Sequence, residues 1–436
     1  MDIIGKYEII RELGKGGTST VYLALDPFNN QQVALKLFNF DKNPDPGLAK
    51  THRKLLLTEA SLVGKLSHPH IVKVFDAMLE GPVNFMVMEY VEGETLAHYT
   101  DVSRLLPFGT ISEIIYKCCK ALEYAEQQGV IHRDIKPANI LLKGQSDIKI
   151  SDFGSAMVLS QQTTQVVGVG SPAYMSPEQI DEQVLTHQTD IYSLGVTMYQ
   201  LLTGKLPFEG ANNYSLLYQI MNVEPQPVGK FRPGIPQELE AIVVRAMKKD
   251  MTQRYQTWNE FAQDLVSFYS KDVETHTDIL DMEKFDILRA LAFFKDFSDV
   301  ELWEVLRISE WRKVPMGKHI LHEGGLGKEF FILGHGTVKI IKRGLLLSVL
   351  NKGDCFGEMA HLSERNFTRT TDVVASSNVT LIEINPEILE RATPGCQFQI
   401  DAAFLRLLVN RLDAANTRIS NLLSSDEKAG AEDTTL

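Results

Sequence analysis

The segment HRDIKPAN, residues 132–139, brings an acidic, a basic and an amide side chain close together in the chain. In a loop that follows a helix, Asp134 can accept or orient a hydroxyl proton, Lys136 can neutralise a phosphate, and Asn139 can ligate a divalent metal. The segment SDFGSA, residues 151–156, then sets Asp152 just past the strand-like run DIKI, where a carboxylate can hold Mg²⁺ between phosphates. These residue types indicate a site for phosphates and their metal ions.

A glycine-rich segment near the N-terminus offers a second set of phosphate contacts. GKGGTSTV, Gly14 to Val21, separates two strand-like runs, so its backbone could approach phosphates closely and present N–H donors. Ser19 replaces the third glycine of the common G-x-G-x-x-G spacing, and such a hairpin taken alone is more often a plain turn. The next strand carries VALK, and a lysine such as Lys36 in an apolar strand is usually a solvated edge residue unless an anion pairs with it.

Taken together and in order, GKGGTSTV, VALK, HRDIKPAN, DFG and SPE resemble the eukaryotic-type protein kinase family over about residues 7–269. The lysine in DIKPAN is similar to the serine/threonine branch rather than the tyrosine branch. The resemblance implies an enzyme that uses ATP and Mg²⁺ to phosphorylate Ser and Thr hydroxyls of protein substrates. The alternative is a non-catalytic signalling scaffold, although such scaffolds usually lose a residue that this chain keeps at Lys36, Asp134 and Asp152.

The resemblance also implies a role for each matching residue. Asp134 would be the catalytic base, with Lys36 and Lys136 as further catalytic residues, while Asn139 and Asp152 would hold the metal ions. The ATP site would consist of Gly14, Lys15, Gly16, Gly17, Val21, Ala34, Lys36, Glu59, Met88, Glu89 and Val91. Within that set, Lys36 would contact the α- and β-phosphates and pair with Glu59, and residues 88–91 would form the adenine-binding hinge.

Two buried contacts are expected in the helical part of such a kinase. Glu178, in the segment SPAYMSPEQ, is expected to pair with Arg254 in QRY. Asp190 resembles the buried helix aspartate that holds the backbone of the HRD loop. Ser176 stands where the family usually has alanine, which is a conservative departure.

Regulation by phosphorylation is suggested by Arg133, which precedes the catalytic aspartate. Its guanidinium could bind a phosphorylated activation segment in a charge-assisted contact that orders the loop. Thr163 and Thr164 are the first candidates for autophosphorylation. The alternative is that these hydroxyls only solvate a loop.

The hydrophobic pattern divides the chain into regions with different periods. Residues 7–40 alternate apolar and polar positions, which predicts antiparallel strands, and from about Ile111 the spacing becomes helical. After Leu302 short strand-like runs between closely spaced glycines suit a compact barrel or jelly roll, and residues 397–423 return to helix. We therefore predict a kinase domain at residues 1–270, a linker at 271–284, a second domain at 285–424 and a disordered tail at 425–436.

The second domain contains CFGEMAHLSERNFTRTT, residues 355–371. A cyclic phosphate needs backbone N–H groups, an arginine, and a carboxylate that accepts from the ribose hydroxyl, and this stretch offers each. Together with EGGLGKEFFILGHGTVKI, residues 323–340, it resembles the cyclic nucleotide-binding domain family over about residues 285–424. The matching residues would be Gly357, Glu358, Met359, Ala360, Arg369 and Thr370, with cyclic AMP or cyclic GMP as a regulatory ligand.

The two resemblances together imply an α+β chain. A two-lobed protein kinase fold, with a β-rich N-lobe and a helical C-lobe, would be followed by a β jelly-roll domain with flanking helices. This second domain departs from its family in two respects: the loop between Glu358 and Arg369 is longer than usual, and His361 replaces an apolar residue. The alternative is a degenerate domain that binds no nucleotide and serves only in protein interaction or dimerisation.

The C-terminal helix carries apolar residues at alternating spacings of three and four. They are Leu405, Leu408, Leu412, Ala415, Ile419 and Leu422. This spacing is typical of a short two-stranded coiled coil, which would make a homodimer. The alternative is an amphipathic helix that lies on its own barrel and acts as a lid.

Composition bounds the cellular setting. The 436 residues carry a formal net charge of −12, so no global basic field favours nucleic acid as a partner. The four cysteines form no C-x-x-C pair, which favours reduced thiols. No apolar run approaches the roughly 18 residues of a membrane span. We therefore expect a cytoplasmic signalling protein.

Overall fold

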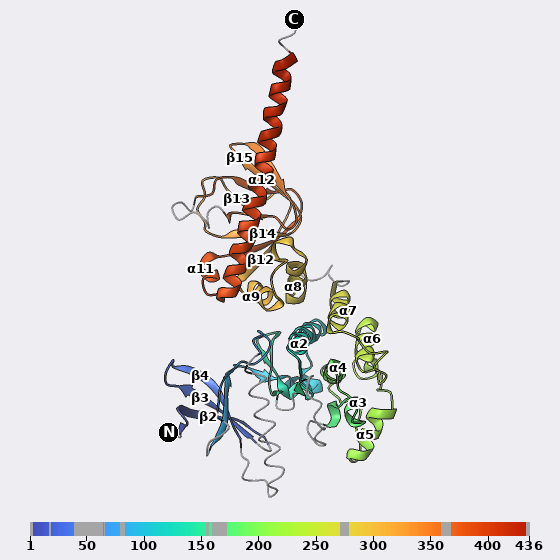
Figure 1. Cartoon of the computed structure of the whole chain (residues 1–436). Coiled ribbons are helices and arrows are strands. Elements are labelled where there is room, and N and C mark those ends of the chain that lie inside the picture. The colour runs from blue at the N-terminus through green and yellow to red at the C-terminus, as the bar shows by residue number, and fades with distance from the viewer. Residues whose placement is uncertain are drawn as a thin grey trace. The chain divides into compact units, whose positions relative to one another are not determined.

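The computed structural model of the protein describes residues 3–16, 19–38, 64, 66–78, 83–153, 157–158, 172–270, 279–358 and 368–432. The chain divides into two compact units, Met1–Thr277 and Asp278–Leu436 (Figure 1). The division falls inside the polar stretch at residues 271–284 that the sequence marks as a connector.

The first unit begins with a six-stranded antiparallel sheet in the order β1-β2-β3-β4-β6-β5. The strands are β1 (Ile3–Ile4), β2 (Tyr7–Lys15), β3 (Ser19–Asp26), β4 (Gln31–Phe38), β5 (Val74–Met78) and β6 (Asn84–Glu89). One face is buried through alternating residues, among them Ala24, Leu35 and Val87, which pack with Tyr7 and Phe85. The alternation over residues 7–40 therefore predicted β2, β3 and β4, whereas β1, β5 and β6 lie outside that range.

The rest of the first unit is mainly helical, as the change of period predicts. Its helices are α2 (Phe108–Gln127), α3 (Pro177–Ile180), α4 (His187–Thr203), α5 (Asn213–Asn222), α6 (Gln237–Ala246) and α7 (Trp258–Ser270). Short 3-10 helices occupy Leu96–Tyr99, Val102–Arg104, Pro137–Asn139, Pro172–Tyr174 and Val228–Lys230. Helix α2 packs against α4 and α7 and buries Ile114, Cys118 and Leu122, so this helix forms the centre of the lobe.

Short strands position the loops that carry the polar motifs. Strands β7 (Glu94–Thr95), β9 (Ile140–Lys143) and β10 (Asp147–Ile150) form one sheet in the order β10-β9-β7, and β8 (Val130–Ile131) pairs with β11 (Met157–Val158). The HRDIKPAN loop joins β8 to β9, and Asp152 follows β10. Because β9 and β10 are antiparallel neighbours, the start of β9 and the end of β10 lie side by side, which brings Asn139 close to Asp152.

The second unit opens with helices α8 (Asp281–Ala290) and α9 (Asp299–Ile308) and a 3-10 helix at Ala292–Phe294. Two four-stranded antiparallel sheets follow, in the orders β12-β19-β14-β17 and β13-β18-β15-β16. Their strands are β12 (Ser309–Val314), β13 (His319–Leu321), β14 (Phe330–His335), β15 (Val338–Lys342), β16 (Leu345–Leu350), β17 (Cys355–Phe356), β18 (Asp372–Ala375) and β19 (Val379–Ile384). Phe331 and Leu381 from one sheet pack with Val338 and Val373 from the other, which makes the predicted jelly roll.

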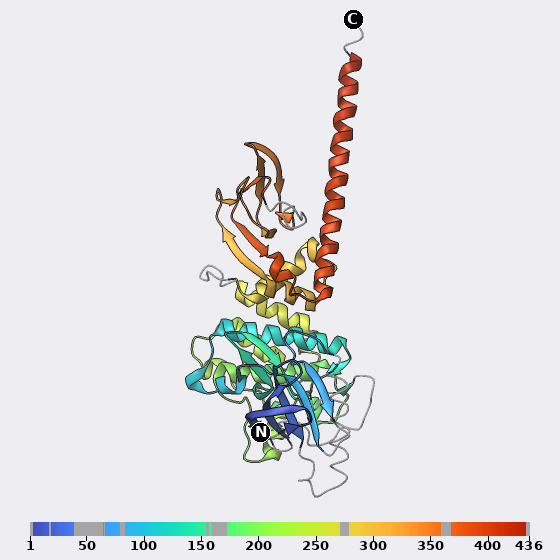
Figure 2. The ribbon, with the colours of Figure 1, turned by 90° about the vertical axis from the view of Figure 1, so that its left-hand side faces the viewer.

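Two expectations for the second unit need correction. The strands begin at Ser309, because residues 299–308 form α9 and use Leu302, Trp303 and Leu306 as a buried helical face. Helix α11 (Pro386–Leu389) and the long helix α12 (Pro394–Glu432) end the described chain. Helix α12 includes residues 425–432, which the polar composition had indicated as a disordered tail. Figure 2 shows α12 passing the strands of this unit and continuing beyond them.

All four cysteines are buried and unpaired. Burial raises the pKa of the Cys396 thiol to about 12, so this thiol stays protonated and packs as a small apolar group. Among the described helices, none combines the length and the apolarity needed to cross a bilayer.

Candidate functional site

The loop between β8 and β9 brings three predicted residues into direct contact. Lys136 Nζ lies 2.6 Å from Asp134 Oδ2. Asn139 Nδ2 donates to the backbone oxygen of Asp134 at 2.8 Å and to its Oδ2 at 3.0 Å. Because the amide nitrogen of Asn139 makes both bonds, its amide oxygen is the atom that remains to face a hard cation such as Mg²⁺.

A buried aspartate holds the backbone of this loop. Asp190 on α4 accepts from the backbone N–H of His132 at 2.7 Å and of Arg133 at 2.8 Å. Burial raises the pKa of the Asp190 carboxyl, against the opposing effect of the nearby donors and charges. Arg133 has φ of 66°, a left-handed conformation that is uncommon for a residue with a side chain. The two bonds from Asp190 stabilise that turn, as the sequence predicted for this residue.

Asp152 follows β10 and is paired with the predicted lysine. Its Oδ1 is 2.7 Å from Lys36 Nζ. Burial raises the pKa of Asp152, but the Lys36 ammonium outweighs burial, so the pKa lies below its ordinary value and the carboxylate is ionised at neutral pH. Ser151 donates its backbone N–H to Asn139 O at 2.8 Å, which ties the two predicted metal-binding segments together.

The first sheet presents the predicted nucleotide residues on one face. Val21 is the cross-strand partner of Lys36, and Ala34 is the partner of Met88. Residues two apart in a strand share a face, so Lys36 and Ala34 point the same way and all four side chains line one surface. This surface joins a cation to apolar side chains, which suits a phosphate-bearing ligand with a flat base.

Several other predicted nucleotide residues occupy neighbouring positions. Gly14 is the partner of Val21, and Lys15 and Gly16 continue along the same hairpin. Glu89 ends β6 and pairs with Lys149 Nζ at 2.8 Å, so its carboxylate is already engaged. Its backbone N–H also donates to Lys73 O at 2.8 Å, so this donor is engaged as well. Val91 follows in the extended connection to β7.

Some predicted residues lie outside the part of the chain that the structure describes. They are Gly17, Glu59, Thr163, Thr164, Met359 and Ala360. Three features therefore stay predictions: the pairing of Lys36 with Glu59, the choice of phosphorylation site, and the backbone contacts of residues 359 and 360.

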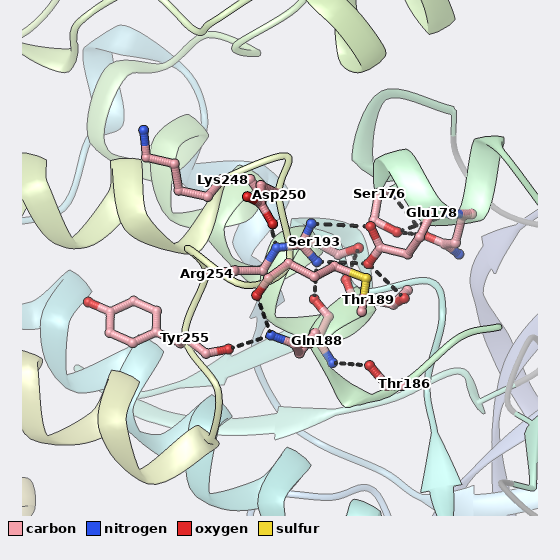
Figure 3. A network of polar contacts seen from close by, with 12 residues as sticks. Ser176, Glu178, Thr186, Gln188, Thr189, Ser193, Lys248, Asp250, Arg254 and Tyr255 are labelled. Carbon is pink, nitrogen blue, oxygen red and sulfur yellow. Dashed lines mark hydrogen bonds and ion pairs between the residues drawn. The ribbon is translucent and has the colours of Figure 1, made fainter. Parts of the chain in front are cut away.

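The expected pair between Glu178 and Arg254 is present and buried (Figure 3). Arg254 Nη1 donates to Glu178 Oε1 at 2.7 Å, and Nη2 donates to Oε2 at 3.1 Å. Thr189 Oγ1 donates to the same carboxylate at 3.0 Å, and Arg254 also reaches the backbone oxygens of Lys248 and Gln188. The pair thus fixes the SPE segment to α4 and to the loop before α7.

Sequence reasoning missed a residue that links the SPE segment to the catalytic loop. Gln179 Nε2 donates to Arg133 O at 3.1 Å, and its Oε1 accepts from the backbone N–H of Ser176 at 3.0 Å. Ser176 caps α3 in a capping box with Gln179, which gives a reason for a hydroxyl where the family usually has alanine. The spacing S-x-x-Q was the available signal.

In the second unit, the predicted residue Arg369 is only 6% exposed. Its Nη1 donates to Gly357 O at 3.1 Å and its Nη2 to Glu329 Oε2 at 3.1 Å. Its Nε has no hydrogen-bond partner among the described residues, although it is buried. Gly357 has φ of 81°, and a Cβ there would lie 2.9 Å from Arg369 Nη1, so the turn needs glycine. Glu329 was not predicted.

Glu358 is 4% exposed and is engaged by a residue from α12. Arg411 donates from Nη1 to Glu358 Oε1 and from Nη2 to Cys355 O. A cavity of about 680 Å³ lies beside these groups, and its lining includes Glu358, Arg369, Thr370 and Arg411. Four predicted or newly found polar residues therefore meet at one cavity, with α12 covering part of it.

Comparisons with known proteins agree with this division into units. The protein kinase domain family matches residues 7–266, and the cyclic nucleotide-binding domain family matches residues 311–393. The chain is 34% identical over 296 residues to the serine/threonine-protein kinase PrkC of Bacillus subtilis, covering 67% of this chain and 45% of that protein. It is 37% identical over 272 residues to the serine/threonine-protein kinase PknB of Mycobacterium leprae, covering 61% and 43%.

The chain thus spans less than half the length of these two relatives. The kinase match alone covers more than half of the chain, and it coincides with the unit that contains the Asp134 loop and the Lys36–Asp152 pair. The chain therefore belongs to the protein kinase family, and it carries a cyclic nucleotide-binding domain after the kinase domain.

Proposed function

We propose that this chain is a serine/threonine protein kinase that transfers the γ-phosphoryl group of ATP to protein hydroxyls. The observation that carries the proposal is the hydrogen-bonded loop of Asp134, Lys136 and Asn139, which Ser151 links to Asp152. A general base, a cation and two oxygen ligands for Mg²⁺ are the groups that phosphoryl transfer needs. The relatives that match are also named serine/threonine-protein kinases, which supports the choice of hydroxyl.

In this mechanism Asp134 orients the substrate hydroxyl and accepts its proton. The hydroxyl oxygen forms a bond to the γ-phosphorus while the bond from that phosphorus to the departing ADP oxygen breaks. Lys136, which lies against Asp134, neutralises charge on the transferred group. Mg²⁺, held by Asn139 and Asp152, would offset the charge of the phosphates.

The contact between Lys36 and Asp152 has a consequence for nucleotide binding. Both groups are paired with each other at 2.7 Å, yet the mechanism needs Lys36 on the phosphates and Asp152 on the metal. Binding of Mg·ATP supplies each with a new partner of opposite charge, so the exchange loses little electrostatic free energy. Lys36→Met is therefore expected to weaken ATP binding and to lower turnover.

The test is phosphorylation of a generic protein substrate by the full chain with Mg·ATP, followed by identification of the phosphorylated amino acids. Asp134→Asn should lower the rate at least about 100-fold, because the general base is lost while the side-chain shape is kept. Lys143→Met is the control, since this lysine is exposed at the end of β9. Failure of the unsubstituted chain to turn over ATP would instead support a non-catalytic scaffold, and phosphotyrosine as the main product would contradict the serine/threonine assignment.

We also propose that the cavity of the second unit binds a cyclic nucleotide that regulates the kinase in cis. The buried Arg369 Nε without a partner in the described chain supports an anionic ligand, because an unpaired buried donor is costly. The nearby Glu358 carboxylate would accept from a ribose hydroxyl. Its contact with Arg411 means that the ligand has to displace or share that arginine.

Calorimetric titration of the full chain with cyclic AMP and with cyclic GMP tests this second proposal. Arg369→Gln should abolish binding, and Arg391→Gln is the control because this exposed arginine lies outside the cavity lining. If the kinase is active, binds neither cyclic nucleotide and keeps the same rate in their presence, the result supports the degenerate-domain alternative. That result would leave the kinase assignment unchanged.

A further inference from the structure

Two histidines and an aspartate converge on the surface of the second unit, where neither the kinase chemistry nor the proposed nucleotide site uses them. His319 begins β13, His322 follows that strand, and Asp372 begins the neighbouring strand β18. One ligand atom from each residue lies within 4.8 Å of the others. His319 and Asp372 belong to two antiparallel strands that are hydrogen-bonded neighbours, and His322 lies just past the end of the first.

The convergence depends on an irregularity in the strand. Residues three apart in a regular strand point to opposite faces of the sheet, so His319 and His322 would ordinarily be separated by the backbone. The pairing of β13 with β18 shifts register between His319 and Leu321, which alters that alternation. The two imidazole rings consequently stack, with their centroids 4.7 Å apart and an interplanar angle of 8°.

The aspartate is held in place for such a site. Asp372 Oδ1 accepts from the backbone N–H of Glu323 at 2.9 Å and lies 3.8 Å from His322 Nδ1. Both histidine rings are exposed, so they can rotate without disturbing the core. Four-coordinate zinc places neighbouring ligand atoms about 3.3 Å apart, given bonds of about 2.0 Å. To bind one ion, the two rings have to turn from their stacked arrangement so that one nitrogen of each faces the ion.

The ligand set selects the type of cation. Two imidazoles and one carboxylate suit Zn²⁺ and similar first-row ions, whereas Mg²⁺ and Ca²⁺ prefer oxygen ligands alone. Three protein ligands leave a fourth position of a tetrahedral ion for water or another ligand. We propose that His319, His322 and Asp372 form a binding site for Zn²⁺ or a similar transition-metal ion.

A metal ion here would fasten β13 to the start of β18. The adjoining backbone already supports Arg369: its N–H donates to Gly325 O at 2.7 Å, and its oxygen accepts from Gly324 N at 2.8 Å. Gly324 and Gly325 lie two and three residues beyond His322, and Asp372 lies three residues beyond Arg369. The ion would therefore stiffen the two segments that carry the arginine of the cavity.

Titration of the full chain with Zn²⁺, in reducing buffer with excess Mg²⁺ to occupy the kinase metal site, tests this proposal. The unsubstituted chain should bind one more Zn²⁺ than His319→Ala, His322→Ala and Asp372→Asn. His335→Ala is the matched control, because this exposed histidine at the end of β14 is not part of the cluster. Loss of that one ion in the three variants, with retention in the control, is the expected result.

A second measurement with Co²⁺ identifies the ligands directly. Co²⁺ at this site should give the visible absorption of a four-coordinate ion with nitrogen and oxygen ligands and without a sulfur charge-transfer band, and His322→Ala should abolish it. Circular dichroism of each variant verifies that it is folded. The proposal is overturned if folded variants bind as much Zn²⁺ as the unsubstituted chain, or if all chains bind the extra ion only at millimolar concentration.

Discussion

The buried contact of Arg254 with Glu178 illustrates how one arginine can satisfy several distant groups. Its three donor nitrogens reach the carboxylate and the backbone oxygens of Lys248 and Gln188, and its guanidinium lies 5.0 Å from the centre of the Tyr192 ring. Lysine cannot reproduce this arrangement, because an ammonium is a single point of charge without the planar fork. The pair therefore depends on the identity of both residues.

Removing the arginine should be strongly destabilising. Arg254→Met leaves the Glu178 carboxylate buried without its main partner, and breaking such a pair typically costs about 3–5 kcal/mol. Urea denaturation, followed through the unfolding transition of the first unit, measures this loss in the free energy of unfolding. Arg245→Met is the control, because Arg245 makes solvent-exposed ion pairs and a contact with the Tyr255 ring, and losing these should cost less than breaking a buried pair. Equal losses for the two variants would contradict the argument.

The same pair predicts an effect of pH. Burial raises the pKa of Glu178, but Arg254 and the hydrogen bonds to the carboxylate outweigh burial, so the pKa lies below its ordinary value of 4.5. A carboxyl whose pKa is lowered by folding contributes stability that is complete above the unfolded pKa and is lost as the pH falls through the folded pKa. Glu178→Gln should therefore lose most stability relative to the unsubstituted chain at neutral pH, and the difference should shrink below pH 4.5. A difference that grows with acidity would contradict this sign.

At the scale of elements, helix α12 presents both of the surfaces that the two alternatives from the sequence require. Phe404 packs on Phe293 and Phe330, and Arg411 reaches Glu358, so one stripe of the helix faces its own domain. Leu405 and Leu412 are 64% and 63% exposed and lie on another stripe, one residue further along the helix. A lid contact and a surface for a second helix can therefore coexist.

This division also shows the limits of prediction from sequence. Periodicity located the strands and helices because alternation and helical spacing depend on local burial, and the kinase motifs located Asp134 and Asp152 because each is contiguous in sequence. The partners Arg411 and Glu329 lie 53 and 40 residues from the groups they contact, and no local pattern marks them. The seam over residues 405–422 mixed two stripes, because three-four spacing alone cannot say which residues the barrel covers.

If Arg411 competes with the ligand for Glu358, removing it should strengthen nucleotide binding. Arg411→Ala frees the buried carboxylate from a partly exposed arginine, and about 1 kcal/mol for such a pair corresponds to about fivefold tighter binding. Arg406→Ala is the matched control on the same helix, since Arg406 pairs with Asp296 rather than with the cavity. Calorimetric titration with the cyclic nucleotide that binds compares the affinities of the two variants with that of the unsubstituted chain. Weaker binding after Arg411→Ala would indicate that the arginine contacts the ligand instead of competing with it.

At the scale of the whole molecule, the exposed stripe on α12 bears on oligomeric state. Phe398, Leu405 and Leu412 repeat every seven residues, with the exposed Val409 between the last two, which matches one seam of a two-stranded coiled coil. The homodimer stays a prediction, and Leu405→Glu with Leu412→Glu should shift it to monomer in sedimentation velocity. Val184→Glu is the control, because this exposed apolar residue lies in the kinase domain. Monomer at all concentrations in the unsubstituted chain would contradict the dimer.

Regulation in cis requires that ligand binding to one unit is coupled to ligand binding or catalysis in the other. This coupling can be tested without knowing how the units are arranged. If the cyclic nucleotide changes the affinity for ATP by some factor, ATP must change the affinity for the cyclic nucleotide by the same factor. Both affinities can be measured in the full chain, using a non-hydrolysable ATP analogue with Mg²⁺. We expect equal factors of about 5 to 150, the usual range of such coupling. Arg369→Gln should remove the effect on ATP while leaving ATP affinity itself unchanged. If both nucleotides bind tightly but neither changes the affinity for the other, coupling through binding is contradicted. Regulation would then have to act on the rate of phosphoryl transfer alone.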